Sequence, residues 1–73
     1  MISKKRFVSK LRELGYDFKE QLHYQERWRL RGGTHIIHVP RRDNLEEEFV
    51  RFNLKHAGQS KDQIERFIRE AKA

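Results

Sequence analysis

The stretch Tyr24-Gln-Glu-Arg-Trp-Arg-Leu-Arg-Gly-Gly-Thr-His-Ile-Ile-His-Val-Pro40 decides the fold. Trp28 and Leu30 alternate with arginines, and a period of two predicts a strand with one buried face. The pair Gly32-Gly33 then predicts a tight hairpin turn. Pro40 ends the returning strand because proline cannot donate to a sheet ladder. We therefore expect antiparallel strands at about residues 23–31 and 34–39.

The residues before and after this hairpin complete the fold. Tyr16 and Phe18 alternate with charged residues and predict another strand at about residues 16–20, although the turn that follows, near residues 20–23, is poorly marked. Apolar stripes predict helices at about residues 3–14, 45–57 and 61–71, with caps at Ser3, Asp43 or Asn44, and Ser60. The predicted fold class is α+β in the order α-β-β-β-α-α. Its helices cover one face of a small three-stranded antiparallel sheet and leave the other face open.

Length and composition exclude several classes of protein. The chain has 73 residues, 36% of them hydrophobic and 38% charged, which predicts one domain over residues 1–73 with a small core. The absence of cysteine excludes a disulfide framework, a zinc ribbon and thiol catalysis, and it suits the cytosol. We find no secretory signal and no apolar run of about 18 residues, so a cytoplasmic protein without membrane contact is expected. A chain this short has little room for a cofactor, and none is expected.

Positive charge is concentrated in the first part of the chain. Residues 1–42 carry eleven Lys/Arg against four Asp/Glu, whereas residues 43–73 carry six against seven. Such asymmetry favours a polyanionic partner, most often nucleic acid. The alternative is a solvated surface that keeps a small domain soluble.

A row of arginines on the central predicted strand is the strongest binding candidate. Residues two apart on a strand point to the same face, so five side chains would line the open face together: His23, Gln25, Arg27, Arg29 and Arg31. Guanidinium groups about 6.5–7 Å apart match the scale of phosphate spacing, and each can bind two oxygens. Arg41 and Arg42 would extend the patch. The alternative is a charged strand that only protects the sheet from aggregation.

The four histidines differ in what their positions predict. His23 lies on the basic face and is the candidate acid or base for RNA cleavage, with a plain turn residue as its alternative. His35 and His38 are three residues apart, so they point to opposite faces and cannot form a one-sided metal pair. His56 belongs to an apolar stripe and is expected at the edge of the core. No metal site is predicted.

Two aromatic side chains near the arginines need separate assignments. Trp28 alternates with the arginine row, so we expect it in the core rather than as a platform for bases. Tyr24 would be able to stack on a base, but its position in the same alternation favours the core or its rim.

Four blocks along nearly the whole chain carry a resemblance to a known family: Phe7-Val-Ser-Lys-Leu-Arg-Glu-Leu-Gly-Tyr16, Val39-Pro40, Leu45 and Val50-Arg-Phe-Asn-Leu-Lys-His-Ala-Gly-Gln-Ser60. By their order and spacing the chain resembles the HicA family of small mRNA-cleaving bacterial toxins. The resemblance implies a fold like a double-stranded-RNA-binding domain, an mRNA substrate, and an acidic antitoxin similar to HicB that covers the same face. The family's catalytic Gly-Ser-His is missing here, and its histidine position falls on Gln25.

Three functions therefore remain open. The first is a HicA-like RNA-binding toxin domain, with Arg27, Arg29 and Arg31 on phosphates and His23 as the acid or base if it cleaves. The second is an RNA-binding module without catalysis, which Gln25 favours because an amide cannot act as a general base. The third is a protein-interaction domain whose arginines only solubilise it.

Overall fold

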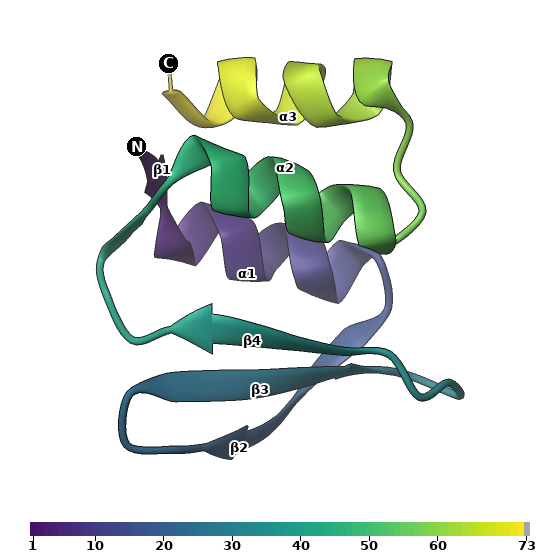
Figure 1. The fold of residues 1–73 in the computed structure, drawn as a ribbon. Helices are drawn as coiled ribbons and strands as arrows, with labels where there is room; N and C mark the ends of the chain where they lie inside the picture. The colour runs from purple at the N-terminus through teal and green to yellow at the C-terminus, as the bar shows by residue number, and fades with distance from the viewer. Residues whose placement is uncertain (73) are drawn as a thin grey trace.

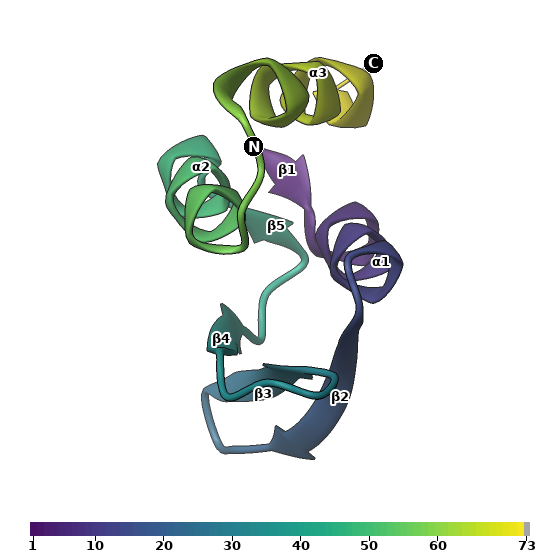
Figure 2. The ribbon, with the colours of Figure 1, turned by 90° about the vertical axis from the view of Figure 1, so that its right-hand side faces the viewer.

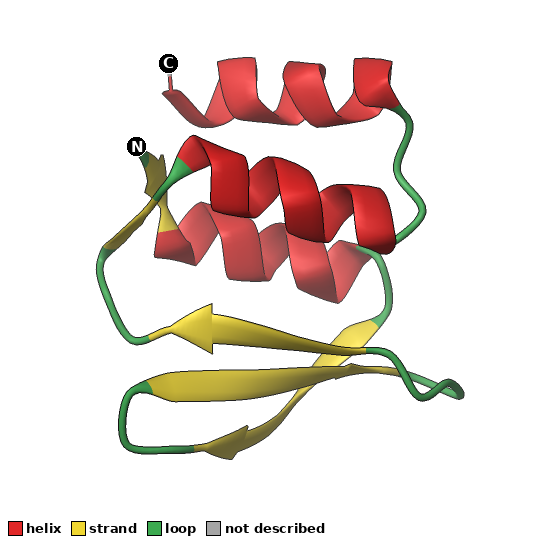
Figure 3. Ribbon diagram, viewed as in Figure 1, coloured by secondary structure: helices red, strands yellow, loops and turns green. Residues whose placement is uncertain are grey.

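The computed structural model describes residues 1–72 and contains the three-stranded antiparallel sheet and the three helices that the sequence predicts (Figure 1). Two very short strands are present in addition. The elements in chain order are β1 (Ile2–Ser3), α1 (Lys4–Glu13), β2 (Tyr16–Gln21), β3 (Gln25–Leu30), β4 (Ile36–Pro40), β5 (Asn44–Leu45), α2 (Glu47–His56) and α3 (Lys61–Lys72). Figure 3 shows β2, β3 and β4 as a layer of their own, whereas the two short strands lie at the level of the helices.

The main sheet has the order β2-β3-β4, with β3 in the centre. Trp28 pairs with Phe18 on one side and with Ile37 on the other, so these three side chains share a face. Trp28 is only 2% exposed, which identifies this as the face that packs against the helices. The alternation in β3 therefore predicted the orientation of the strand correctly.

The strand boundaries differ from the predictions at both ends of the hairpin. β3 begins at Gln25 instead of residue 23 and ends at Leu30 instead of residue 31, and β4 begins at Ile36 instead of residue 34. Residues 22–24 form the turn into β3, where the amide of Leu22 donates to the carbonyl of Gln25 at 2.7 Å. His23 is therefore outside the strand, and the prediction that it continues the row behind Gln25 was wrong.

A second sheet joins the short segments that precede α1 and α2. β1 pairs antiparallel with β5, and Ile2, which is fully buried, lies opposite the equally buried Leu45. The predicted caps Asp43 and Asn44 do not start a helix, since residues 44 and 45 extend along β1 and α2 begins only at Glu47. Pairing between strands of two residues depends on tertiary contact, and no local pattern in the sequence signals it.

Helix ends follow the sequence signals elsewhere. Ser60 and Gln63 cap α3 reciprocally: the Gln63 amide donates to Ser60 Oγ at 3.2 Å, and the Ser60 amide donates to Gln63 Oε1 at 2.8 Å. Gly15 follows α1 with a φ of +93°, a conformation that side chains with a Cβ rarely adopt. This residue turns the chain from α1 directly into β2.

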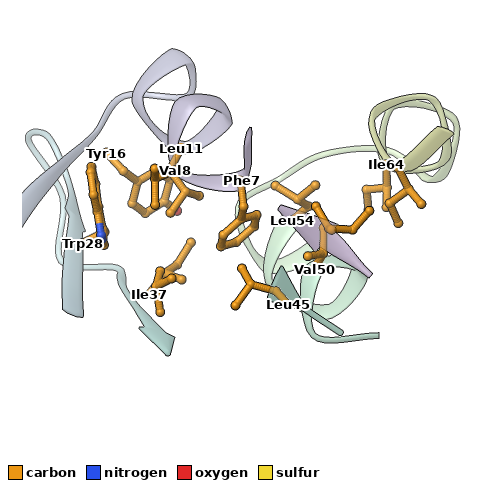
Figure 4. Close-up of a cluster of buried hydrophobic side chains, with 13 residues drawn as sticks. Phe7, Val8, Leu11, Tyr16, Trp28, Ile37, Leu45, Val50, Leu54 and Ile64 are labelled. Atoms are coloured by element: carbon orange, nitrogen blue, oxygen red, sulfur yellow. The ribbon is translucent and has the colours of Figure 1, made fainter. Parts of the chain in front are cut away.

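The core lies between the helices and the inner face of the sheet. Phe7 and Leu11 of α1 pack toward Trp28 and Ile37, while Val50 and Leu54 of α2 face Ile64 of α3 (Figure 4). Seen from the side, the three helices of residues 1–72 lie above the sheet and leave its lower face uncovered (Figure 2). None of these helices is long and apolar enough to cross a bilayer.

Candidate nucleic-acid interface

The uncovered side of the sheet, here called the open sheet face, is set by the pairing register. Arg27 of β3 lies opposite Glu20 of β2 and His38 of β4, and the next row pairs Arg29 with Asp17 and Ile36. Directly opposite residues point to the same side of a sheet, and Trp28 points inward, so all of these side chains face outward. Gln25, opposite Pro40, completes this face.

Carboxylates of β2 accept hydrogen bonds from two of the three row arginines. Arg31 donates to both carboxylate oxygens of Asp17, at 3.0 and 2.8 Å, and Arg27 donates to Glu20 at 3.1 Å. The hydrogen bond from Arg31 holds the pKa of the Asp17 carboxyl below its ordinary value. These pairs reduce the positive charge of the face. Sequence reasoning missed them because they depend on how β2 aligns with β3.

The remaining contacts of the arginine row are weak. Arg29 is exposed, and its Nε donates only to the backbone carbonyl of Gly33 at 3.1 Å. The Nε of Arg27 is buried and finds no acceptor among residues 1–72. The Arg27 guanidinium therefore has one donor that is unsatisfied in its present position.

At one end of the open sheet face lies a shallow hollow of about 390 Å³, here called the Tyr24 hollow, whose lining residues are His23, Tyr24, Pro40, Arg41 and Arg42. Tyr24 is 81% exposed, so the prediction that it joins the core or its rim was wrong. It belongs to the turn rather than to β3, and the inward alternation starts only beyond it. An aromatic ring this exposed, with two arginines beside it, is typical of surfaces that stack on bases.

The turn that presents Tyr24 is fixed by backbone contacts. Arg41 Nη1 donates to the carbonyl of His23 at 3.1 Å, and the Arg41 amide donates to the carbonyl of Tyr24 at 3.1 Å. The ring of His23 stands nearly perpendicular to that of Tyr24, at 82° with 4.3 Å between centroids. Arg41 and Arg42 follow β4 and are here called the β4 exit. Through Arg41 this segment holds the β2–β3 turn and brings His23, Tyr24 and Arg41 together.

The structure separates the other histidines. His38 is exposed on the open sheet face, whereas the ring of His35 is turned the other way and contacts the hydroxyl of Tyr16 through Nδ1. His56 is exposed on α2 with Nδ1 near the carbonyl of Phe52, so its expected place at the core edge was wrong. Within residues 1–72, no three His, Cys, Asp or Glu side chains are grouped so as to hold a metal ion.

The predicted site residues therefore form one surface of two adjoining parts. The open sheet face contains Gln25, Arg27 and Arg29. The lining of the Tyr24 hollow includes His23, Arg41 and Arg42. Arg31 lies at the side of the open sheet face, where it is hydrogen-bonded to Asp17. Sequence reasoning did not assign His38 or Tyr24 to this surface. The alternation over 36–39, with Ile37 and Val39 buried, is the signal that places His38 outward.

Searches of protein-family models, of curated proteins and of solved structures find no match to this chain. The residues of the interface alone therefore carry the functional proposal.

Proposed function

We propose that this protein binds single-stranded RNA along the open sheet face and in the Tyr24 hollow. The observation that carries the proposal is the 81% exposed ring of Tyr24, which lies between His23 and the arginines of the β4 exit at the end of an uncovered sheet face. Bases that are not already stacked in a duplex can stack on such a ring. This favours single-stranded over double-stranded RNA.

Phosphates would meet arginines on both sides of that ring. Arg42 is exposed and has no carboxylate within 4.0 Å in residues 1–72, and Arg29 is held only by a backbone carbonyl. Arg31 and Asp17 form an exposed pair, and pairs of this kind contribute little to stability because water and salt screen them. A phosphate, which accepts the same two-pronged contact, can replace the carboxylate at this arginine.

Salt dependence tests this proposal directly. A fluorescent oligouridine should bind with a log–log salt slope of about −2 to −4, because each neutralised phosphate of a single strand contributes about 0.7. The double variant Arg29→Ala/Arg42→Ala should flatten this slope by about 1.4. Lys55→Ala/Lys61→Ala removes the same charge from exposed positions outside the interface and should leave the slope unchanged. A flat salt response of the wild-type protein would show that RNA is not its ligand.

A second candidate function, cleavage of the bound RNA, is favoured by the two exposed histidines of the interface. One histidine would take the proton of a 2′-hydroxyl, whose oxygen then attacks the adjacent phosphorus. The bond to the 5′-oxygen breaks as the other histidine protonates it, which leaves a 2′,3′-cyclic phosphate and a free 5′-hydroxyl. His38 lies opposite Arg27, with Cβ atoms roughly 4.5–5.5 Å apart, so a phosphate on that arginine is within its reach.

We also propose that the chain is related to the HicA toxins and has a fold like that of double-stranded-RNA-binding domains. The α-β-β-β-α core of the chain supports it, while Gln25 at the position of the family's histidine favours a binding module without catalysis. In a toxin of this kind the partner would be an acidic antitoxin similar to HicB, which would cover the interface in the cytoplasm. An exposed positive surface also speeds the approach of such a partner.

Induction of the chain in bacteria separates cleavage from binding. For a toxin, we expect growth arrest and shortened mRNA with the wild type, and loss of both with His23→Ala or His38→Ala. His56→Ala serves as the matched control because His56 is equally exposed but lies on α2. Growth without arrest, combined with RNA binding in vitro, would assign the chain as a binding module. Arg29→Ala should weaken either activity through binding alone.

A further inference from the structure

A second hollow lies on another part of the molecule, between α1 and α3. It has a volume of about 730 Å³, and five Lys/Arg and two Glu line it. The two helices run in opposite directions (Figure 1), and both contact β1, which lies between them (Figure 2). We call it the α1–α3 groove and define it by Lys5, Arg6 and Lys10 of α1 and Gln63, Arg66 and Phe67 of α3.

Four cations of this groove form no ion pair within residues 1–72. Lys5, Arg6, Lys10 and Arg66 have no carboxylate within 4.0 Å in residues 1–72, whereas Lys4, beside them in the sequence, pairs with Glu26. The first turn of α1 contains no acidic residue. Cations in this position oppose the helix dipole, so they reduce the stability of α1 unless an anion offsets them.

Two apolar residues, Phe67 and Ala71, line the groove and are here called its floor. Phe67 is half-buried and packs against the core, and Ala71 follows it one turn later on the same side of α3. A ring held in this way does not stand out to receive a base, in contrast to Tyr24. The floor instead suits aliphatic side chains that enter from a docked helix.

We propose that the α1–α3 groove binds an amphipathic helix of a partner protein that carries acidic residues beside an aliphatic stripe. Cations on both walls meet the carboxylates, and Phe67 and Ala71 receive the aliphatic side chains. Two carboxylates of the groove, Glu13 and Glu70, argue against RNA, which carries a negative charge at every nucleotide. A peptide spaces its carboxylates and can place neutral residues at these two positions. This inference does not depend on RNA binding elsewhere.

The test uses three fluorescent probes: a helical peptide of about fourteen residues with leucines at i, i+3, i+4 and i+7 and flanking glutamates, a scrambled peptide of identical composition, and a short oligouridine. We expect saturable binding of the amphipathic peptide with a Kd on the order of 10 µM. The scrambled peptide should bind at least about tenfold more weakly, because it carries the charge without the aliphatic stripe. Amide shifts in NMR spectra should cluster on α1 and α3.

Matched charge reversals locate the site. Lys10→Glu/Arg66→Glu changes one residue on each wall and should weaken the peptide at least about tenfold, since like charges then face each other. Lys55→Glu/Lys61→Glu has the same net charge with its changes outside the groove and should bind nearly as the wild type does.

Three results would overturn the inference. They are the absence of saturable peptide binding, equal binding of the scrambled peptide, and stronger shifts of α1 and α3 amides with oligouridine than with peptide. The last would identify the groove as a nucleic-acid site. RNA binding at Tyr24 is measured by separate variants, so the failure of either proposal is recognised independently.

Discussion

Removal of the Tyr24 ring is the sharpest test of the interface. The side chain is 81% exposed and its ring contact is with His23, so Tyr24→Ala should change the free energy of unfolding by no more than about 0.5 kcal/mol. Stacking of a base on an aromatic side chain contributes about 1–3 kcal/mol, which corresponds to roughly 5- to 150-fold in Kd. We therefore expect a large loss of RNA affinity without a loss of fold.

The assay is fluorescence anisotropy with an oligouridine of about eight nucleotides at about 50 mM salt, alongside urea unfolding. Tyr24→Phe keeps the aromatic face and should bind within about threefold of the wild type. Phe52→Ala removes an aromatic ring of α2 that is 57% exposed, and it is the matched control. If Tyr24→Ala binds within about twofold of the wild type, or if Phe52→Ala loses as much affinity, stacking at Tyr24 is refuted.

Three further predictions follow from individual contacts. Asp17→Asn frees Arg31 and removes a negative charge, so RNA affinity in the same anisotropy assay should rise by up to about fivefold; a fall would contradict competition between the carboxylate and phosphate. Trp28→Ala should destabilise the protein by about 3–5 kcal/mol in urea unfolding, and a loss below about 1 kcal/mol would contradict its place in the core. Burial alone would raise the pKa of the Glu26 carboxyl, but hydrogen bonds from Lys4 and Trp28 outweigh it and lower the pKa below 4.5. Its contribution to stability is therefore present above about pH 4.5 and lost as pH falls through the lower, folded-state value, so Glu26→Gln should flatten the pH dependence of urea unfolding there; an unchanged acid slope would contradict this assignment.

The parts of the fold that sequence predicted well have local signals. The alternation around Trp28 predicted the buried side of the central hairpin, and Gly32-Gly33 marked the position of its turn. The connection between the strands is wider than the predicted tight turn, because it spans residues 31–35. Gly15 and the Ser60–Gln63 capping box likewise mark helix ends within a few residues. Each of these features acts over one turn or one hairpin, so its outcome does not depend on the rest of the chain.

The parts that sequence did not predict depend on pairing between distant residues. The β1–β5 sheet joins residues 2–3 to residues 44–45, and only contact between the two segments defines it. Tyr24 continues the alternation of β3 in sequence, yet the turn at residues 22–24 removes it from the strand. The register between β2 and β3 shifts between Phe18 and Glu20, and this irregularity helps decide which carboxylate faces Arg27.

The pattern of ion pairs helps explain why cations of α1 and of the segment after β4 have no carboxylate partner within residues 1–72. Glu47 lies within 4.0 Å of the N-terminal amine, Arg51 and Lys72. Glu65 accepts two hydrogen bonds from Arg51. Carboxylates in the second half of the chain therefore form ion pairs that join α2, α3 and the N-terminus. These carboxylates are thus engaged away from the cations of α1 and of the β4 exit. The main sheet and α1 lie apart in the molecule (Figure 2). Unpaired lysines and arginines therefore line two separate hollows, the Tyr24 hollow beside the sheet and the α1–α3 groove. The two proposals together imply that the protein would bind different anionic partners at the same time, one by base stacking on Tyr24 and one in the groove lined by Phe67 and Ala71.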